Sequence, residues 1–245
     1  MAWYAYCICE QASFQQSRVR RPFPIGPFAG LNGGAVLGFP CGDFVVVVSE
    51  IEHGRPLEQQ NAVEHARIVG ECFKMATLLP FKFGTVFEHD EALRLAIRNN
   101  KKTFADSIAR LRGKSEMHIK VVVREGSTIA EVFTNLPHKA GGEYLSKLKE
   151  QASRDRERQS RARALSVQVN KLLNPLKEEV SCKKVESGIV LDIAHLIDST
   201  GVEKYQNRYS SALRQFKGVE ISLSGPWPPY HFMPDRDKVR TVVNN

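Results

Sequence analysis

The side chains that could perform acid–base or nucleophilic chemistry are scattered along this 245-residue chain rather than paired. His195, with Asp192 and Asp198 close in sequence, is the nearest approach to a catalytic pair. Side chains alternate between the two faces of a strand, so Asp192 and His195 would point to opposite sides and could not work together. No serine lies in a GxSxG context, which nucleophilic hydrolases of the α/β type require. These residues indicate a protein without catalytic activity.

Glycines and cysteines also fail to form a recognisable ligand site. The glycine-rich segment 26–38, GPFAGLNGGAVLG, matches neither the GxxxxGK[ST] nor the GxGxxG phosphate-binding pattern. The five cysteines (7, 9, 41, 72 and 182) are odd in number and have no repeated spacing, and zinc would need CxxC-type pairs or a Cys/His set. Cys7 and Cys9 should share one face of a strand. We predict buried or incidental thiols, no metal and no cofactor.

The segment 224–232, SGPWPPYHF, holds three prolines and three aromatic residues directly after a strand-like run. Proline removes a backbone N–H and favours extended geometry in the residue before it. We therefore expect the strand to stop at Gly225 and to continue as a stiff, polyproline-like arm. The arm would pack against the protein itself or dock a partner. The candidate partner-binding residues are Trp227, Pro228, Tyr230 and Phe232.

The composition is that of a globular protein, with 42% hydrophobic and 25% charged residues. The apolar run 44–48 is too short to cross a bilayer, and the N-terminus lacks a signal-peptide pattern, so we expect a cytoplasmic protein. Residues 139–177 contain ten Lys/Arg and four Asp/Glu, so +6 of the net charge of +8 falls there. Such a segment is either a solvated helix face or a surface for nucleic acid or another polyanion.

Hydrophobic periodicity predicts an alternation of strands and helices. A loop-rich excursion is expected over 11–42, with four prolines and six glycines, and a long basic helix over 143–180 that Pro175 bends or ends. The expected strands are 3–9, 44–51, 117–123, 188–197 and 219–223, and the other expected helices are 61–77, 91–111 and 202–216.

This order predicts an α+β protein of two lobes, residues 1–135 and 136–245, because Pro and Gly gather near 134–142. Segments 111–123 and 216–225 both run from a helix end through glycine and glutamate into a strand. Each lies in a strand–helix–strand unit, so the C-terminal lobe is predicted to be ferredoxin-like, with the basic helix at its start.

Four sequence blocks, in the order LPFKFGTVF, EMHIKV, GGEYL and SGPWPPYHF, resemble the GvpF/GvpL family of gas vesicle synthesis proteins. The resemblance extends from the first strand to Phe232, and the last block is its most specific part. It departs at Gly142, where the family usually has arginine before Glu-Tyr-Leu. The resemblance implies two α+β domains and no enzymatic activity.

The resemblance also implies an accessory or minor structural protein of the gas vesicle that binds the hydrophobic shell protein GvpA. It would limit aggregation of GvpA and assist nucleation and assembly, together with other accessory proteins. We expect no membrane, nucleic acid or small-molecule partner. The competing interpretation is a nucleic-acid or anionic-surface binding module that uses the basic helix 147–163. Phe81, Phe83 and Phe87 are expected in the core.

Overall fold

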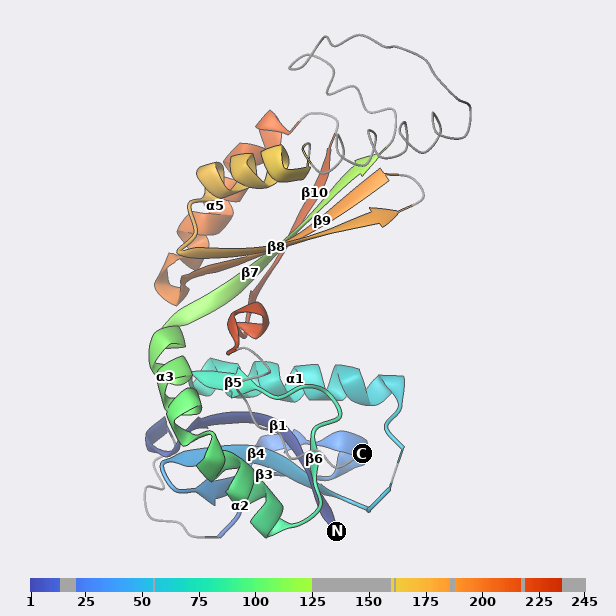
Figure 1. Cartoon of the computed structure of the whole chain (residues 1–245), viewed down its shortest axis with the longest axis vertical. Helices are drawn as coiled ribbons and strands as arrows, with labels where there is room; N and C mark the ends of the chain where they lie inside the picture. Colours follow the sequence, from blue (N-terminus) through green and yellow to red (C-terminus); the bar gives the residue numbers. More distant parts are fainter. Residues whose placement is uncertain are drawn as a thin grey trace, which may run out of the picture. The chain divides into compact units, whose positions relative to one another are not determined.

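A computed structural model describes residues 1–13, 21–54, 56–124, 160, 162–185, 188–216 and 219–234. The chain divides into two compact units. The first comprises Met1–Lys114 and Pro228–Asn245, and the second comprises Ser115–Trp227 (Figure 1). The boundary predicted between residues 135 and 136 lies outside the described residues. The units observed divide instead at Lys114, and the end of the chain returns to the first unit.

The first unit contains a six-stranded sheet of order β2-β3-β4-β1-β5, with β6 also pairing with β1. Its strands are β1 (Ala2–Glu10), β2 (Phe23–Ala29), β3 (Ala35–Cys41), β4 (Phe44–Ile51), β5 (Leu78–Pro80) and β6 (Val86–Phe87). Its helices are α1 (Gln59–Met75), α2 (Asp90–Asn99), α3 (Lys101–Leu111) and the short 3-10 helices η1 (Gln11–Ser13), η2 (Leu31–Gly33) and η5 (Tyr230–Phe232).

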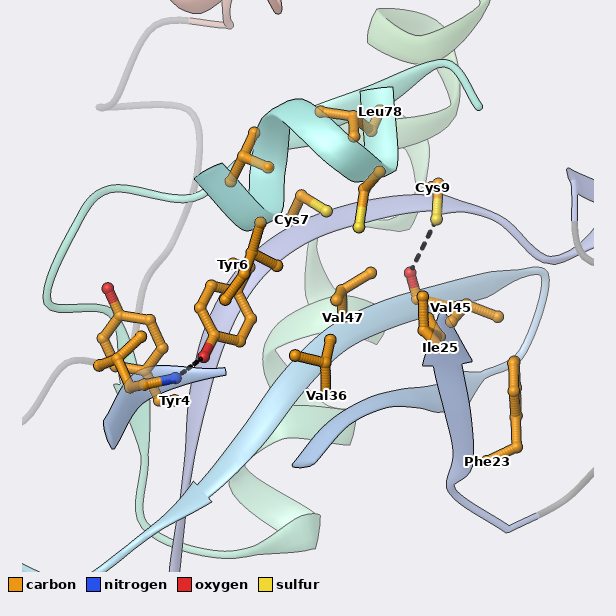
Figure 2. Close-up of a cluster of buried hydrophobic side chains, with 14 of the residues drawn as sticks. Tyr4, Tyr6, Cys7, Cys9, Phe23, Ile25, Val36, Val45, Val47 and Leu78 are labelled. Atoms are coloured by element: carbon orange, nitrogen blue, oxygen red, sulfur yellow. Dashed lines mark hydrogen bonds between the residues drawn. The ribbon is translucent and has the colours of Figure 1, made fainter. Parts of the chain in front are cut away.

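The central strands β1 and β4 are buried on both faces, as their β-branched and aromatic sequences predict. On one face, α1 contributes Ile68, Val69 and Cys72 to a core that includes Val45 and Val47 (Figure 2). On the other face, the rings of Phe44 in β4 and Phe104 in α3 pack edge to face, with 6.3 Å between their centroids. The strand predicted over 44–51 is thereby confirmed with its two-sided burial.

A register shift in β1 between Ala5 and Cys7 changes which side chains share a face. Regular alternation would place Tyr6 and Cys7 on opposite faces, but both belong to the core under α1. Figure 2 shows the hydrogen bond that Cys9 Sγ donates to the carbonyl of Val45, at 3.6 Å. The Leu31 amide donates to the Tyr6 hydroxyl, at 2.9 Å. The prediction that Cys7 and Cys9 share a face as buried thiols is confirmed.

Two predictions for the first unit are wrong. The segment 11–42, predicted to be rich in loops, contains the strands β2 and β3. Strand β2 tolerates its prolines because it ends the sheet, where a missing backbone N–H costs little. The helix predicted over 91–111 is two helices. They meet at Asn100, whose backbone leaves the helical region (φ −111°, ψ 12°) and whose side-chain amide donates to the Ala96 carbonyl.

The second unit contains a four-stranded sheet of order β10-β7-β9-β8. Pairing is antiparallel between β10 and β7 and between β8 and β9. Its core joins the sheet to α5 and to a helix over residues 162–173. The strands are β7 (Lys114–Arg124), β8 (Lys177–Val185), β9 (Gly188–Asp198) and β10 (Glu220–Trp227), and α5 spans Val202–Ala212 between the 3-10 helices η3 (Ser199–Gly201) and η4 (Leu213–Gln215).

Two predictions for the second unit also need correction. The helix expected over 143–180 has residues 143–159 outside the described part, and the helical segment ends at residue 173, before Pro175, where Asn174 adopts φ 49°. Residues 177–185 form β8 instead of continuing the helix. Strand β10 does not stop at Gly225, because a register shift between Ser224 and Trp227 carries the pairing with β7 past Pro226.

Candidate functional site

The first unit has a groove of about 600 Å³ formed by two segments that are far apart in the sequence. One segment is 79–85, which follows the start of β5, and the other is 230–234, at the C-terminal end of the described chain. We call this site the aromatic groove. It is lined by Ile8, Leu79, Pro80, Phe81, Lys82, Phe83, Gly84, Thr85, Phe104, Tyr230, His231, Met233 and Pro234.

Backbone hydrogen bonds fix the 79–85 wall of the groove to β1. The Phe81 amide donates to the Tyr6 carbonyl and the Ala5 amide donates to the Thr85 carbonyl, both at 2.9 Å. Between these two anchors the chain turns at Gly84, whose φ of 89° is a conformation that glycine adopts without steric cost. The turn directs Phe83 outward, and 41% of its surface stays exposed.

A buried histidine supports the same wall from below. His65 of α1 is 4% exposed, and its Nε2–H donates to the Phe81 carbonyl at 3.2 Å while its Nδ1 accepts from the Tyr4 hydroxyl at 2.8 Å. The Gly84 amide donates to that hydroxyl in turn, at 3.3 Å. Burial lowers the pKa of His65 to about 4, against the opposing effect of the Phe81 carbonyl. The neutral ring therefore positions the wall and does not meet a ligand.

The 230–234 wall is formed by the proline-rich block after β10. Pro228 and Pro229 are buried, and the Tyr230 amide donates to the Pro228 carbonyl at 2.8 Å. Phe232 is 2% exposed and anchors η5, and the Arg110 guanidinium donates to its carbonyl at 2.6 Å. Tyr230 then lines the groove with 39% of its surface exposed.

The four predicted partner-binding residues fall into three different settings. Tyr230 lines the groove, and Pro228 and Phe232 are buried beneath its wall. Trp227 is the last residue of the second unit; it is 48% exposed, and its indole N–H donates to the Ser224 hydroxyl. The structure places Trp227 outside the lining of the groove.

The expectation that Phe81, Phe83 and Phe87 are all core residues holds only for Phe87, which is 3% exposed. Phe81 is partly buried and Phe83 exposed, and both line the groove. Gly84, directly after Phe83, was the feature of the sequence that could have indicated the exposure of Phe83. A turn at glycine ends the strand-like alternation of residues 79–87, on which the assignment of Phe83 to the core depended.

Of the residues considered for catalysis or metal binding, His195 and four of the five cysteines are buried, whereas Cys182 and Asp198 are exposed. His195 has no exposed surface; its Nδ1 lies 2.6 Å from the Tyr205 hydroxyl and its Nε2 lies 3.6 Å from Glu178 Oε2. Burial lowers the pKa of His195 to about 4, although the Glu178 carboxylate opposes this shift. Burial also raises the pKa of the Cys41 thiol to about 12. Within the described ranges, no three His, Cys, Asp or Glu side chains are grouped to hold a metal ion.

Known proteins are similar to this chain over both segments that form the groove, 79–85 and 230–234. A family model described as gas vesicle synthesis protein GvpL/GvpF matches residues 2–234, which include both walls. The chain belongs to this family. Members are structural or accessory proteins of the gas vesicle and are generally non-enzymatic.

Two relatives are similar in sequence. Gas vesicle protein L of Streptomyces sp. (strain CB03234) is 26% identical over 69% of this chain and 66% of the relative. Gas vesicle protein L1 of Halobacterium salinarum (strain ATCC 700922 / JCM 11081 / NRC-1) is 25% identical over 96% of this chain and 91% of its own length.

Two crystal structures share the fold. Gas vesicle protein GvpF of Anabaena sp. PCC7120 aligns with a TM-score of 0.75 over 96% of each chain, at 18% identity. GvpF of Microcystis aeruginosa aligns with a TM-score of 0.70 over 95% of this chain and 99% of the other, also at 18% identity. Among the helices of the described residues, none is long and apolar enough to cross a membrane.

Proposed function

We propose that this GvpF/GvpL protein is an accessory or minor structural protein of the gas vesicle that binds the hydrophobic shell protein GvpA. In this role it limits GvpA aggregation and assists nucleation and assembly in the cytoplasm, alongside other gas vesicle proteins. The observation that carries the proposal is the aromatic groove. The LPFKFGTVF and SGPWPPYHF blocks, which are distant in sequence, supply its two walls.

The groove has the properties of a site for an apolar protein segment. Phe83 and Tyr230 keep about two fifths of their surface in water, and aromatic side chains at the mouth of a concave site commonly mark a binding surface. Covering them with an apolar segment would release the water that they order. Lys82 and His231 provide a polar rim, which is typical of protein interfaces.

Both walls of the groove are held in place before a partner binds, so binding would cost little conformational entropy in this protein. Hydrogen bonds to β1 hold residues 81–85, and the buried Phe232 and the Arg110 contact hold residues 230–234. A pre-formed site loses little conformational entropy when it binds. Tyr230 and Phe83 are therefore the proposed contact residues, and Pro228 and Phe232 support them. Trp227 stays a separate prediction for a partner contact on the second unit.

We infer that the second unit is ferredoxin-like. Its elements run in the order strand, helix, strand, strand, helix, strand, from β7 through the helix over 162–173, β8, β9 and α5 to β10. The sheet order β10-β7-β9-β8 places the first and last strands side by side, with the first strand also beside the third. This arrangement supports the split βαβ topology.

Co-expression with GvpA tests the proposed function. We expect this protein to keep GvpA soluble and to co-purify with it at both low and high salt, because burial of apolar surface does not weaken as ionic strength rises. Capture only at low salt would instead favour the anionic-surface interpretation. The basic segment 147–163 on which that interpretation depends lies almost entirely outside the described residues. Absence of capture at either salt concentration would contradict the proposal.

A further inference from the structure

Strand β8 ends the four-stranded sheet of the second unit and pairs with β9 along one side only (Figure 1). The described part of the chain places no strand against its other side. An end strand of this kind offers unpaired N–H and C=O groups, onto which a further strand can add. The middle of β8, residues 179–183, is exposed.

The charges along β8 are self-complementary. Its sequence is KEEVSCKKV, in which Glu178 and Glu179 precede the centre at Ser181 and Lys183 and Lys184 follow it; Lys177 at the start would face Val185. If two copies of β8 pair antiparallel with Ser181 opposite Ser181, then Glu179 of each copy lies opposite Lys183 of the other. Opposite charges at directly facing positions stabilise a pair of strands. We propose that β8 is a self-association surface, through which a second copy of this chain extends the sheet across a two-fold axis.

The charge pattern specifies the direction of this pairing, and the two faces of the sheet favour one register. Parallel pairing in register would place Glu179 beside Glu179 and Lys183 beside Lys183, and facing like charges are destabilising. An antiparallel slip by one residue replaces the Glu179–Lys183 pairs by Glu178–Lys183 pairs in one direction and by Glu179–Lys184 pairs in the other. Each slip also turns the helix-covered face of one sheet to the same side as the uncovered face of the other. The Glu178 carboxylate already accepts hydrogen bonds from Ser166 and Asn170 of its own unit. The register with Ser181 opposite Ser181 keeps like faces together and leaves these bonds intact.

Charged residues on an end strand often prevent unwanted pairing, and β8 is protected in this way against most other strands. A self-complementary pattern makes a second copy the exception, because each charge then meets its opposite. Glu179 already lies 2.9 Å from Lys177 on its own strand. Both side chains are about half exposed, so this ion pair is weak and leaves Glu179 able to reach a facing lysine.

Sedimentation equilibrium with charge-exchange variants tests the proposal. We expect the wild-type protein to form a concentration-dependent dimer. Glu179→Lys alone and Lys183→Glu alone place like charges opposite each other, and each should weaken the dimer by about tenfold or more. The double variant Glu179→Lys/Lys183→Glu should restore it. An equimolar mixture of the two single variants should also dimerise, because each supplies the charges that the other needs.

Lys171→Glu is the matched control, since Lys171 is exposed on the helix of the same unit and the charge change is the same. It should leave the dimer unchanged, and circular dichroism should show that all variants remain folded. A wild-type protein that stays monomeric at the highest concentration reached would overturn the proposal. So would single variants that dimerise as well as the wild type, or a mixture that dimerises no better than its components.

Discussion

Replacing Phe83 and Tyr230 together by serine is expected to weaken capture of GvpA by roughly tenfold or more. Both side chains line the aromatic groove and keep about two fifths of their surface exposed, so they have apolar area left to bury against a partner. Serine removes most of that area from both walls at once. The measurement is the amount of GvpA retained per folded molecule in a co-purification at high salt.

The same substitutions should lower the free energy of unfolding much less than they lower the affinity for GvpA. Phe83 contacts the rings of Tyr4 and His65 at centroid distances of 6.4 and 6.1 Å, so its loss costs some packing, but the core beneath it is unchanged. The matched control is Leu95→Ser with Val63→Ser, two exposed apolar residues of the first unit that lie outside the groove. If the control variant loses as much capture as the groove variant, general surface hydrophobicity explains binding and the groove does not.

Mild acid is expected to destabilise the protein through two buried histidines. Burial lowers the pKa of both His65 and His195 to about 4, whereas an unfolded histidine titrates near 6.5. Between these values the unfolded chain binds more protons than the folded one, so stability falls as pH decreases from about 6.5 towards 4. By pH 5 each histidine should cost on the order of 1–2 kcal/mol.

Urea unfolding at pH 7 and pH 5 measures this effect. The loss of unfolding free energy between the two pH values should be smaller in His65→Gln and in His195→Gln than in the wild type, even if either variant is less stable at pH 7. His53→Gln, at an exposed histidine of the first unit, provides the control and should retain the full loss. An identical pH dependence in all four proteins would show that the buried rings do not control acid stability.

The sequence predicted the strands and helices whose hydrophobic pattern is strong. Strand β4 matches its predicted range, since an unbroken β-branched run suits only a strand that is covered on both faces. Strands β2 and β3 were missed because proline and glycine normally indicate loops. Proline is tolerated in β2, which ends the sheet, and glycine is needed at position 38 of β3 because a Cβ there would lie 2.6 Å from the Phe23 ring. Local pattern cannot reveal such tertiary contacts.

The candidate site was only partly predictable for the same reason. Tyr230 was identified from the density of prolines and aromatic residues around it. Phe83 was assigned to the core, because alternation within 79–87 does not show where the chain turns away from the sheet. The convergence of the two blocks depends on the return of residues 228–234 to the first unit. No local feature of the sequence specifies that return.

Photo-crosslinking from the aromatic groove tests the central claim most directly. Benzoylphenylalanine would be placed at position 83 or 230, and at the control position 95, in cells that co-express GvpA. We predict crosslinks to GvpA from positions 83 and 230 and none from position 95. Position 227 would test the separate prediction for Trp227. If GvpA is captured but crosslinks form from position 95 and not from 83 or 230, the shell protein binds elsewhere and the groove is not its site.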